Sequence, residues 1–142
     1  MKTINELQDE IIDEFEAFDD WMERYHLISE YADELKNNPF PEKDRTDQNK
    51  IDGCQSIVWF TCRMEDGKLY FNGDSEALLV KGIVALFLHV LSGHTPKEIL
   101  SADLYFIDRI GLREHLSPTR SNGVAAMLKQ MKLYALAYSA KA

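Results

Sequence analysis

One stretch of this chain, residues 57–71, is rich in strand-forming residues, and it constrains the fold more than any other feature. Ile57 to Arg63 is dominated by β-branched and aromatic side chains, and Lys68 to Phe71 carries further aromatic residues. The sequence Glu65-Asp66-Gly67 between them predicts a tight turn. We therefore expect an antiparallel hairpin. Because a pair of strands alone is marginally stable in water, we also expect a third strand beside it.

Helical spacing of apolar residues precedes this hairpin. From Ile4 to Leu35, apolar side chains recur every three or four positions, as on the buried face of a helix. Asp19 and Asp20 divide the pattern into two helices, and Asp20 followed by Glu23 fits a capping box for the second. Residues 37–50 are polar and include two prolines, which predicts a long loop of the kind that often carries function.

More helices follow the hairpin. Asn72-Gly73 predicts a turn, after which Asp74 or Ser75 is placed to cap an apolar helix from about 76 to 92. Pro96 fits the first turn of a short helix, and a further short helix is expected at 102–110. The last helix is marked by regularly spaced apolar residues: Val124, Met127, Leu128, Met131, Ala135 and Tyr138.

Strands segregated from helices in this order indicate an α+β fold, in which a small antiparallel sheet packs against several helices. A length of 142 residues is typical of a single domain, so we expect one domain over residues 1–142. A chain of this size buries enough apolar surface to fold without a disulfide or a metal.

Charge and hydropathy exclude several classes of partner. Residues 1–36 contain twelve acidic and three basic residues, a net charge of −9, whereas the whole chain carries −8. The basic surface of a nucleic-acid-binding protein is therefore absent. Ala77 to Leu91 is shorter than a membrane span, and the N-terminus is neither a secretory nor a transit peptide. With two cysteines in the chain, we expect reduced thiols and a cytoplasmic location.

The first cysteine, in "KIDGCQSIVWF" (residues 50–60), lies in an unusual place. Asp52-Gly53 predicts a turn, so Cys54 falls at the junction of a loop and a strand, where reactive groups are more common than at strand centres. Burial as a small core residue is the alternative. Cys62 falls within the strand-forming run, and there core filling is the expected role.

The sequence lacks the patterns of several common chemistries. It has no CxxC, HExxH, phosphate loop, dinucleotide fingerprint or GxSxG, so we expect no metal site. A cysteine hydrolase needs a base and an oxyanion hole, and the sequence identifies neither. Exchange at sulfur needs only a thiolate that attacks and one that leaves. Arg120 opposes the dipole of the last helix, so its partner is an anion, such as Asp74 or a thiolate, or it simply reaches solvent.

Three segments of the chain together resemble the SufE family, the sulfur-acceptor proteins of iron–sulfur cluster assembly. They are "RTDQNKIDGCQSIVWF" (45–60), "NGDSEALLVKGIVA" (72–85) and "HLSPTRSNGVAAM" (115–127), in family order. In the first, the residues that match the reactive-cysteine motif are Asn49, Gly53, Cys54, Gln55, Ser56, Val58 and Trp59. The likeness covers roughly residues 5 to 140.

This resemblance implies a SufE/IscU-like fold and a sulfur-transfer function. The protein would accept persulfide sulfur on Cys54 from a cysteine desulfurase, SufS-like or CsdA-like. It would also stimulate that enzyme and pass the sulfur to an iron–sulfur scaffold complex. The chain would need no cofactor of its own, whereas the desulfurase uses pyridoxal phosphate. It would act with the desulfurase rather than as a stand-alone enzyme. The family's reactive loop packs against the body of the free protein and is exposed by the partner.

Loop and pocket roles follow for five other residues: Asn49, Gly53, Gln55, Asp74 and Arg120. Gly53 would let the loop move, Gln55 would hydrogen-bond near the thiol, and Asp74 and Arg120 would shape the pocket or the partner surface. Two alternatives stay open. In one, the chain is an adaptor that activates a desulfurase allosterically without carrying sulfur. In the other, Cys62, which is outside the family motif, would be a second sulfur site or a resolving thiol if it were exposed.

Overall fold

The computed structural model describes residues 2–54, 56–116 and 118–141, apart from the side chains of residues 113, 118–120 and 141. The elements, in chain order, are α1 (Ile4–Glu16), α2 (Trp21–Asp33), β1 (Val58–Glu65), β2 (Lys68–Ser75), α3 (Leu78–Leu91), α4 (Pro96–Ser101), α5 (Phe106–Arg109), α6 (Leu112–His115) and α7 (Pro118–Lys141). The two strands form one antiparallel sheet. The α+β class, with a small sheet and several helices, is therefore confirmed.

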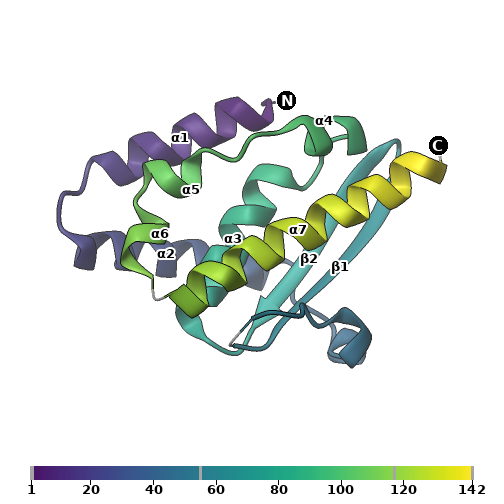
Figure 1. The fold of residues 1–142 in the computed structure, drawn as a ribbon, viewed down its shortest axis with the longest axis horizontal. Coiled ribbons are helices and arrows are strands. Elements are labelled where there is room, and N and C mark those ends of the chain that lie inside the picture. Colours follow the sequence, from purple (N-terminus) through teal and green to yellow (C-terminus); the bar gives the residue numbers. More distant parts are fainter. Residues whose placement is uncertain (1, 55, 117, 142) are drawn as a thin grey trace.

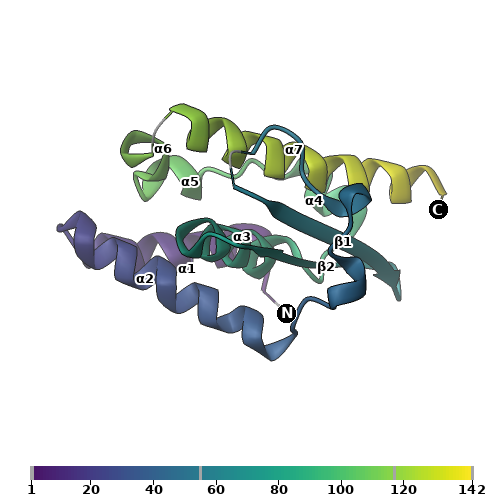
Figure 2. The same cartoon turned by 90° about the horizontal axis from the view of Figure 1, so that it is seen from below.

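Helix α3 lies at the centre of the molecule, beside the hairpin (Figures 1 and 2). The long helix α7 runs across one side of this central layer, and α1 and α2 lie on the other side. Nine of the fourteen residues of α3 are buried, which confirms the expected buried helix. Gly82 lets α2 approach, since a Cβ on it would lie 2.4 Å from the Ile28 side chain.

The hairpin is longer than the sequence indicated. Its turn is formed by Asp66 and Gly67, both with positive φ as a tight hairpin turn requires. The expectation of a second turn at Asn72-Gly73 is wrong, because these residues continue β2 and Gly73 pairs with Phe60. A Cβ at Gly73 would lie 2.5 Å from the Phe60 ring, so this glycine makes room for an aromatic side chain.

The expected cap of the apolar helix is also wrong. Asp74 and Ser75 end β2, and the residue that precedes α3 is Ala77, which makes no side-chain cap. At α2, Asp20 accepts a hydrogen bond from the Met22 amide, but the expected capping box with Glu23 is not formed. Capping boxes close α1 and α4 instead, through Thr3 and Thr95.

The expected third strand is absent from the part of the chain that the structure describes. Helix α7 occupies the outer edge of β1 instead. The hydroxyl of Tyr134 donates to the Phe60 carbonyl at 3.3 Å, and that of Tyr138 donates to the Cys62 carbonyl at 3.2 Å. Four helical residues advance about 6 Å and two strand residues about 6.8 Å, so consecutive outward carbonyls meet consecutive turns of α7.

The outer edge of β2 is paired in a different way. The Leu69 amide donates to the His94 carbonyl at 2.8 Å, and the Gly93 amide donates to the Leu69 carbonyl at 2.7 Å. The Phe71 amide donates to Ser92 Oγ at 3.0 Å. Both edges of the sheet thus have hydrogen-bond partners without a third strand. None of the described helices is long and apolar enough to cross a membrane.

Candidate functional site

Cys54 lies on a short loop whose ends are tied together. We call residues 52–54, 56 and 57 the Cys54 loop; residue 55 is outside the described residues. The Ile51 amide donates to the Val58 carbonyl at 2.9 Å, and both of these side chains are buried. On the far side of the loop, Ser75 Oγ donates to the Ile57 carbonyl at 2.8 Å. The loop therefore projects from a closed neck at the start of β1.

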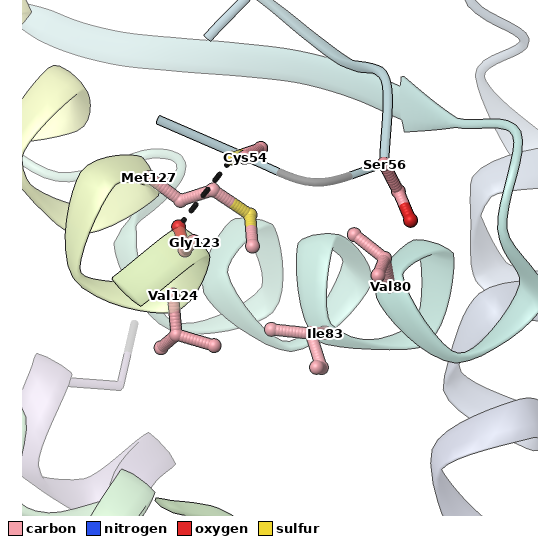
Figure 3. A pocket seen from close by; sticks show the side chains of 7 residues that line it. All are labelled: Cys54, Ser56, Val80, Ile83, Gly123, Val124 and Met127. Atoms are coloured by element: carbon pink, nitrogen blue, oxygen red, sulfur yellow. Dashed lines mark hydrogen bonds between the residues drawn. The ribbon is translucent and has the colours of Figure 1, made fainter. Parts of the chain in front are cut away.

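The Cys54 side chain points from this loop into a small pocket between α3 and α7 (Figure 3). Its thiol donates to the Gly123 carbonyl, with 3.6 Å between sulfur and oxygen. The other lining residues are Ser56, Val80, Ile83, Val124 and Met127. The space left among them is about 20 Å³, enough for about one water molecule. The thiol is thus half-buried in mostly apolar surroundings.

This environment favours the neutral thiol. Burial raises the pKa of Cys54, and among the side chains that the structure describes no positive charge offsets this effect. A nucleophilic thiolate is therefore disfavoured while the loop is docked in the pocket. Chemistry at Cys54 requires the sulfur to leave the pocket or its charge to be stabilised by a partner.

Gly53 gives the Cys54 loop its shape. Its φ of +90° lies in the left-handed region, which L side chains rarely adopt. A Cβ on Gly53 would lie 3.4 Å from the Cβ of Ala126 on α7, so the backbone also approaches the helix closely. The position thus uses a backbone conformation suited to glycine, and movement of the loop about Gly53 stays a prediction.

Asp74 does not line the Cys54 pocket. The Asp74 side chain is 10% exposed, and its carboxylate pairs with the Arg45 guanidinium and lies 3.4 Å from Lys81 Nζ. Burial alone would raise the pKa of Asp74, but hydrogen bonds from Arg45 and from the Ser75 amide, with the charge of Lys81, leave it lowered. The structure thus provides described cations for Asp74 other than Arg120.

Arg45 connects Asp74 to the long loop that precedes Cys54. Its guanidinium carbon lies 4.9 Å from the centre of the Trp59 ring and 5.6 Å from that of Phe40. In the same segment, Asn49 ends a short 3₁₀ helix (Asp47–Asn49), and its side-chain amide donates to the Asp44 carbonyl at 2.8 Å. Asn49 therefore holds the backbone of this segment, which we call the Arg45 segment (residues 38–50).

Two of the expected site residues are Gln55 and Arg120. Gln55 and the side chain of Arg120 are outside the described residues; the backbone of Arg120 lies in the first turn of α7. Sequence reasoning missed Gly123, whose carbonyl accepts from the thiol, although it falls within the "HLSPTRSNG" segment. It also missed the apolar lining residues, which carry no signal beyond helical spacing.

Cys62 lies in a different environment, in the middle of β1 opposite Phe71. It faces a separate open pocket of about 370 Å³, to which the Arg45 segment contributes Asn38 and Asp44. Burial raises the pKa of the Cys62 thiol to about 12. The two thiols therefore line different pockets. Among the residues that the structure describes, no group of three or more histidine, cysteine or carboxylate side chains gathers as a metal site would.

Comparisons with known proteins agree with this picture. The family model SufE, described as an Fe-S metabolism associated domain, matches residues 9–135. An uncharacterized SufE-like protein of Rhizobium meliloti is 42% identical over 130 residues, which cover 87% of this chain and 91% of that protein. A similar protein of Synechocystis is 39% identical, over 90% of this chain and 79% of its own.

A solved structure shows the same fold. The solution structure of a hypothetical protein from Thermus thermophilus superimposes with a TM-score of 0.74, covering 91% of this chain and 93% of that one, at 22% identity. The region matched by the family model contains the Cys54 loop, the strand that follows it and Gly123. By its sequence and its relatives, this chain belongs to the SufE family, whose domain is associated with iron–sulfur metabolism.

Proposed function

We propose that this protein accepts persulfide sulfur on Cys54 from a cysteine desulfurase and passes it to an iron–sulfur cluster scaffold. The observation that carries the proposal is the position of Cys54, a thiol at the tip of a loop with a closed neck, in a chain of the SufE family. A loop of this kind can move without disturbing the sheet, because the Ile51–Val58 hydrogen bond closes it. On this proposal the desulfurase carries pyridoxal phosphate and the chain itself carries no cofactor.

The transfer step is a thiol exchange that is balanced in atoms and electrons. The Cys54 thiolate attacks the terminal sulfur of a cysteine persulfide on the desulfurase. A sulfur–sulfur bond forms to Cys54 while the bond to the partner's cysteine breaks, and that cysteine leaves as a thiolate. The proton lost by Cys54 goes to solvent or to the leaving thiolate. Delivery to the scaffold repeats the exchange with an acceptor thiolate, and Cys54 is regenerated.

The docked loop is the resting state in this scheme. Its thiol is neutral and faces the protein, so the loop must swing outward before attack. Gly53 is a suitable hinge because its backbone already occupies a glycine conformation. Arg45 and Asp74 would keep the neighbouring segment in place while the loop moves. Arg120 is assigned to the pocket or partner surface, and Gln55 to a hydrogen bond near the thiol, on the family motif alone.

Direct mapping of transferred sulfur tests the proposal. The protein is incubated with a cysteine desulfurase and cysteine, and added sulfur is located by mass spectrometry of peptides. We expect one added sulfur on Cys54, lost in Cys54→Ser and retained in the matched variant Cys62→Ser. Arg120→Ala is expected to slow the transfer while the fold stays intact.

Other outcomes favour the alternatives. Absence of any adduct, together with full stimulation of the desulfurase by Cys54→Ser, would contradict the carrier function and identify an allosteric adaptor. Sulfur on Cys62 in the wild-type protein would assign the acceptor role to the strand thiol. Hydrolysis of a thioester or amide in the absence of a partner would indicate a cysteine hydrolase.

A further inference from the structure

The reactive sulfur itself takes part in the contact between the Cys54 loop and the body of the protein. Asp52 and Gly53 are exposed, whereas Cys54 inserts between α3 and α7 and reaches the Gly123 carbonyl. Figure 3 shows this arrangement, with the loop above the two helices and a dashed line that joins Cys54 to the Gly123 carbonyl on α7. Any change in the chemistry of the sulfur therefore acts directly on the contact that docks the loop.

This contact suits a protonated sulfur and not an anion. A thiol donates its hydrogen to the Gly123 carbonyl oxygen, whereas a sulfur anion has no hydrogen to donate and is repelled by that oxygen. Helix α7 presents a carbonyl at this point, so its positive N-terminal dipole is not what the sulfur touches. Of the described side chains that line the pocket, Ser56 alone offers a hydroxyl, and one hydroxyl does not replace the hydration of an anion.

Accepted sulfur changes both the size and the charge of the group. The terminal sulfur lies about 2.05 Å from Sγ. The added sulfur must therefore be placed among the lining side chains, where the free space is about 20 Å³. The terminal S–H of a persulfide is also more acidic than a thiol, so the loaded group carries negative charge in neutral solution. Its charge would face the apolar side chains of Val80, Ile83 and Val124.

We propose that sulfur loading itself keeps the Cys54 loop out of its pocket, because the charged persulfide cannot occupy the place of the neutral thiol beside the Gly123 carbonyl. The loop docks again when the sulfur has been passed on and the thiol is restored. The loaded protein then presents its sulfur to the next acceptor without help from the desulfurase. This inference deepens the proposed function and rests on Cys54 as the acceptor.

The test loads Cys54 chemically, so that it does not depend on any desulfurase. In a Cys62→Ser background, Cys54 is converted to a mixed disulfide, which sulfide then displaces to give the persulfide and a released thiol. Hydrogen exchange of the amides of the Cys54 loop is followed by mass spectrometry. We expect exchange about tenfold or more faster in the persulfide than in the thiol, and a return to the slow rate when a small thiol removes the sulfur.

A matched pair of variants isolates charge from size. Cys54→Asp places a negative charge in the pocket and Cys54→Asn places a neutral group of the same shape there. The proposal expects about tenfold faster exchange in the Cys54→Asp loop than in the Cys54→Asn loop. Equal exchange in this pair, or equal exchange in thiol and persulfide, would overturn it. Failure of desulfurase loading with the switch intact would instead count against the proposed carrier function.

Discussion

Cys54 and Cys62 are eight residues apart, both are partly buried, and burial raises the pKa of both thiols. They differ in the backbone that carries them. Cys62 is fixed in β1, where its neighbours pair with β2 on one side and its own carbonyl accepts from Tyr138 on the other. Cys54 is on a loop that is tied at its neck and docked at its tip. The two thiols therefore resemble each other in exposure and differ in backbone, because one lies in a paired strand and the other on a short loop.

Of the changes considered, loss of the Arg45–Asp74 ion pair should alter stability and the access of reagents to Cys62 the most. The reason is that the Arg45 segment forms a wall of the Cys62 pocket. We expect Asp74→Asn to lower the free energy of unfolding by about 3 kcal/mol, since it leaves Arg45 without its buried partner. Urea denaturation measures this loss. Alkylation of Cys62 should then accelerate more than alkylation of Cys54.

The control for this variant is Glu42→Gln, which removes the exposed carboxylate that lies 3.2 Å from Arg45. It should cost less than about 0.5 kcal/mol. Because the folded-state pKa of Asp74 lies below its ordinary value of 3.8, the stability due to ionised Asp74 is present above that pH and is lost as the pH falls through the folded-state pKa. An equal loss for both variants, or a difference that persists in strong acid, would contradict the assignment.

Alkylation of the wild-type protein measures the difference between the thiols directly. A thiol with a pKa of about 12 is thiolate to about one part in 10⁴ at pH 8, and the paired backbone of β1 holds the Cys62 side chain half-buried. We expect iodoacetamide to modify Cys54 about 100-fold faster than Cys62. Peptide mass spectrometry over time gives both rates. In denaturant the two rates should converge, and similar rates in the native protein would show that backbone freedom does not control reactivity.

The pH dependence of the free energy of unfolding tests the environment of the Cys62 thiol. Its pKa is raised from about 9 to about 12 in the folded protein, so the unfolded chain releases this proton first as the pH rises. The contribution of the protonated Cys62 thiol to the free energy of unfolding is fully present below about pH 9. It is lost as the pH rises from about 9 to about 12. Between pH 9 and pH 11, we expect the free energy of unfolding of Cys62→Ser to fall by about 2 kcal/mol less than that of the wild-type protein. Parallel stability curves for the two proteins would refute this.

The smallest change in stability should come from removing the hydroxyl that donates to the Cys62 carbonyl. Tyr138→Phe removes the donor at 3.2 Å, and we expect a loss of about 1 kcal/mol with the fold unchanged. Tyr134→Phe, the matched change at the Phe60 carbonyl, should cost a similar amount. Leu136→Ala, on the exposed face of α7, is the control and should cost less than either. Thermal melts compare all three, and no loss in either tyrosine variant would show that these edge bonds are dispensable.

Local signals in the sequence predicted much of this fold. The turn at Asp66-Gly67, the buried helix α3, the proline at the start of α4 and the loop position of Cys54 all follow from neighbours within a few residues. Features that depend on distant partners were not predicted. Gly73 reads as a turn residue until Phe60 is known to lie against it, and Asp74 reads as a helix cap until Arg45 is known to pair with it.

The candidate site divides in the same way. Cys54 and Gly53 are recognisable from the turn and from the family motif, since both lie within one short segment. The acceptor for the thiol comes from Gly123, 69 residues away, and the walls come from α3 and α7. No spacing rule connects these positions, because the tertiary packing of the two helices alone brings them together.

The pairing of both sheet edges limits how any partner protein can recognise this molecule. Many recognition domains extend a sheet by adding a strand from the partner, which requires free backbone groups along an edge. Here the outward carbonyls of Phe60 and Cys62 are bonded to α7, and the edge of β2 is bonded to residues 92–94. A partner that paired a strand with this sheet would first have to displace these hydrogen bonds, which favours recognition through side chains and the Cys54 loop over recognition through backbone pairing.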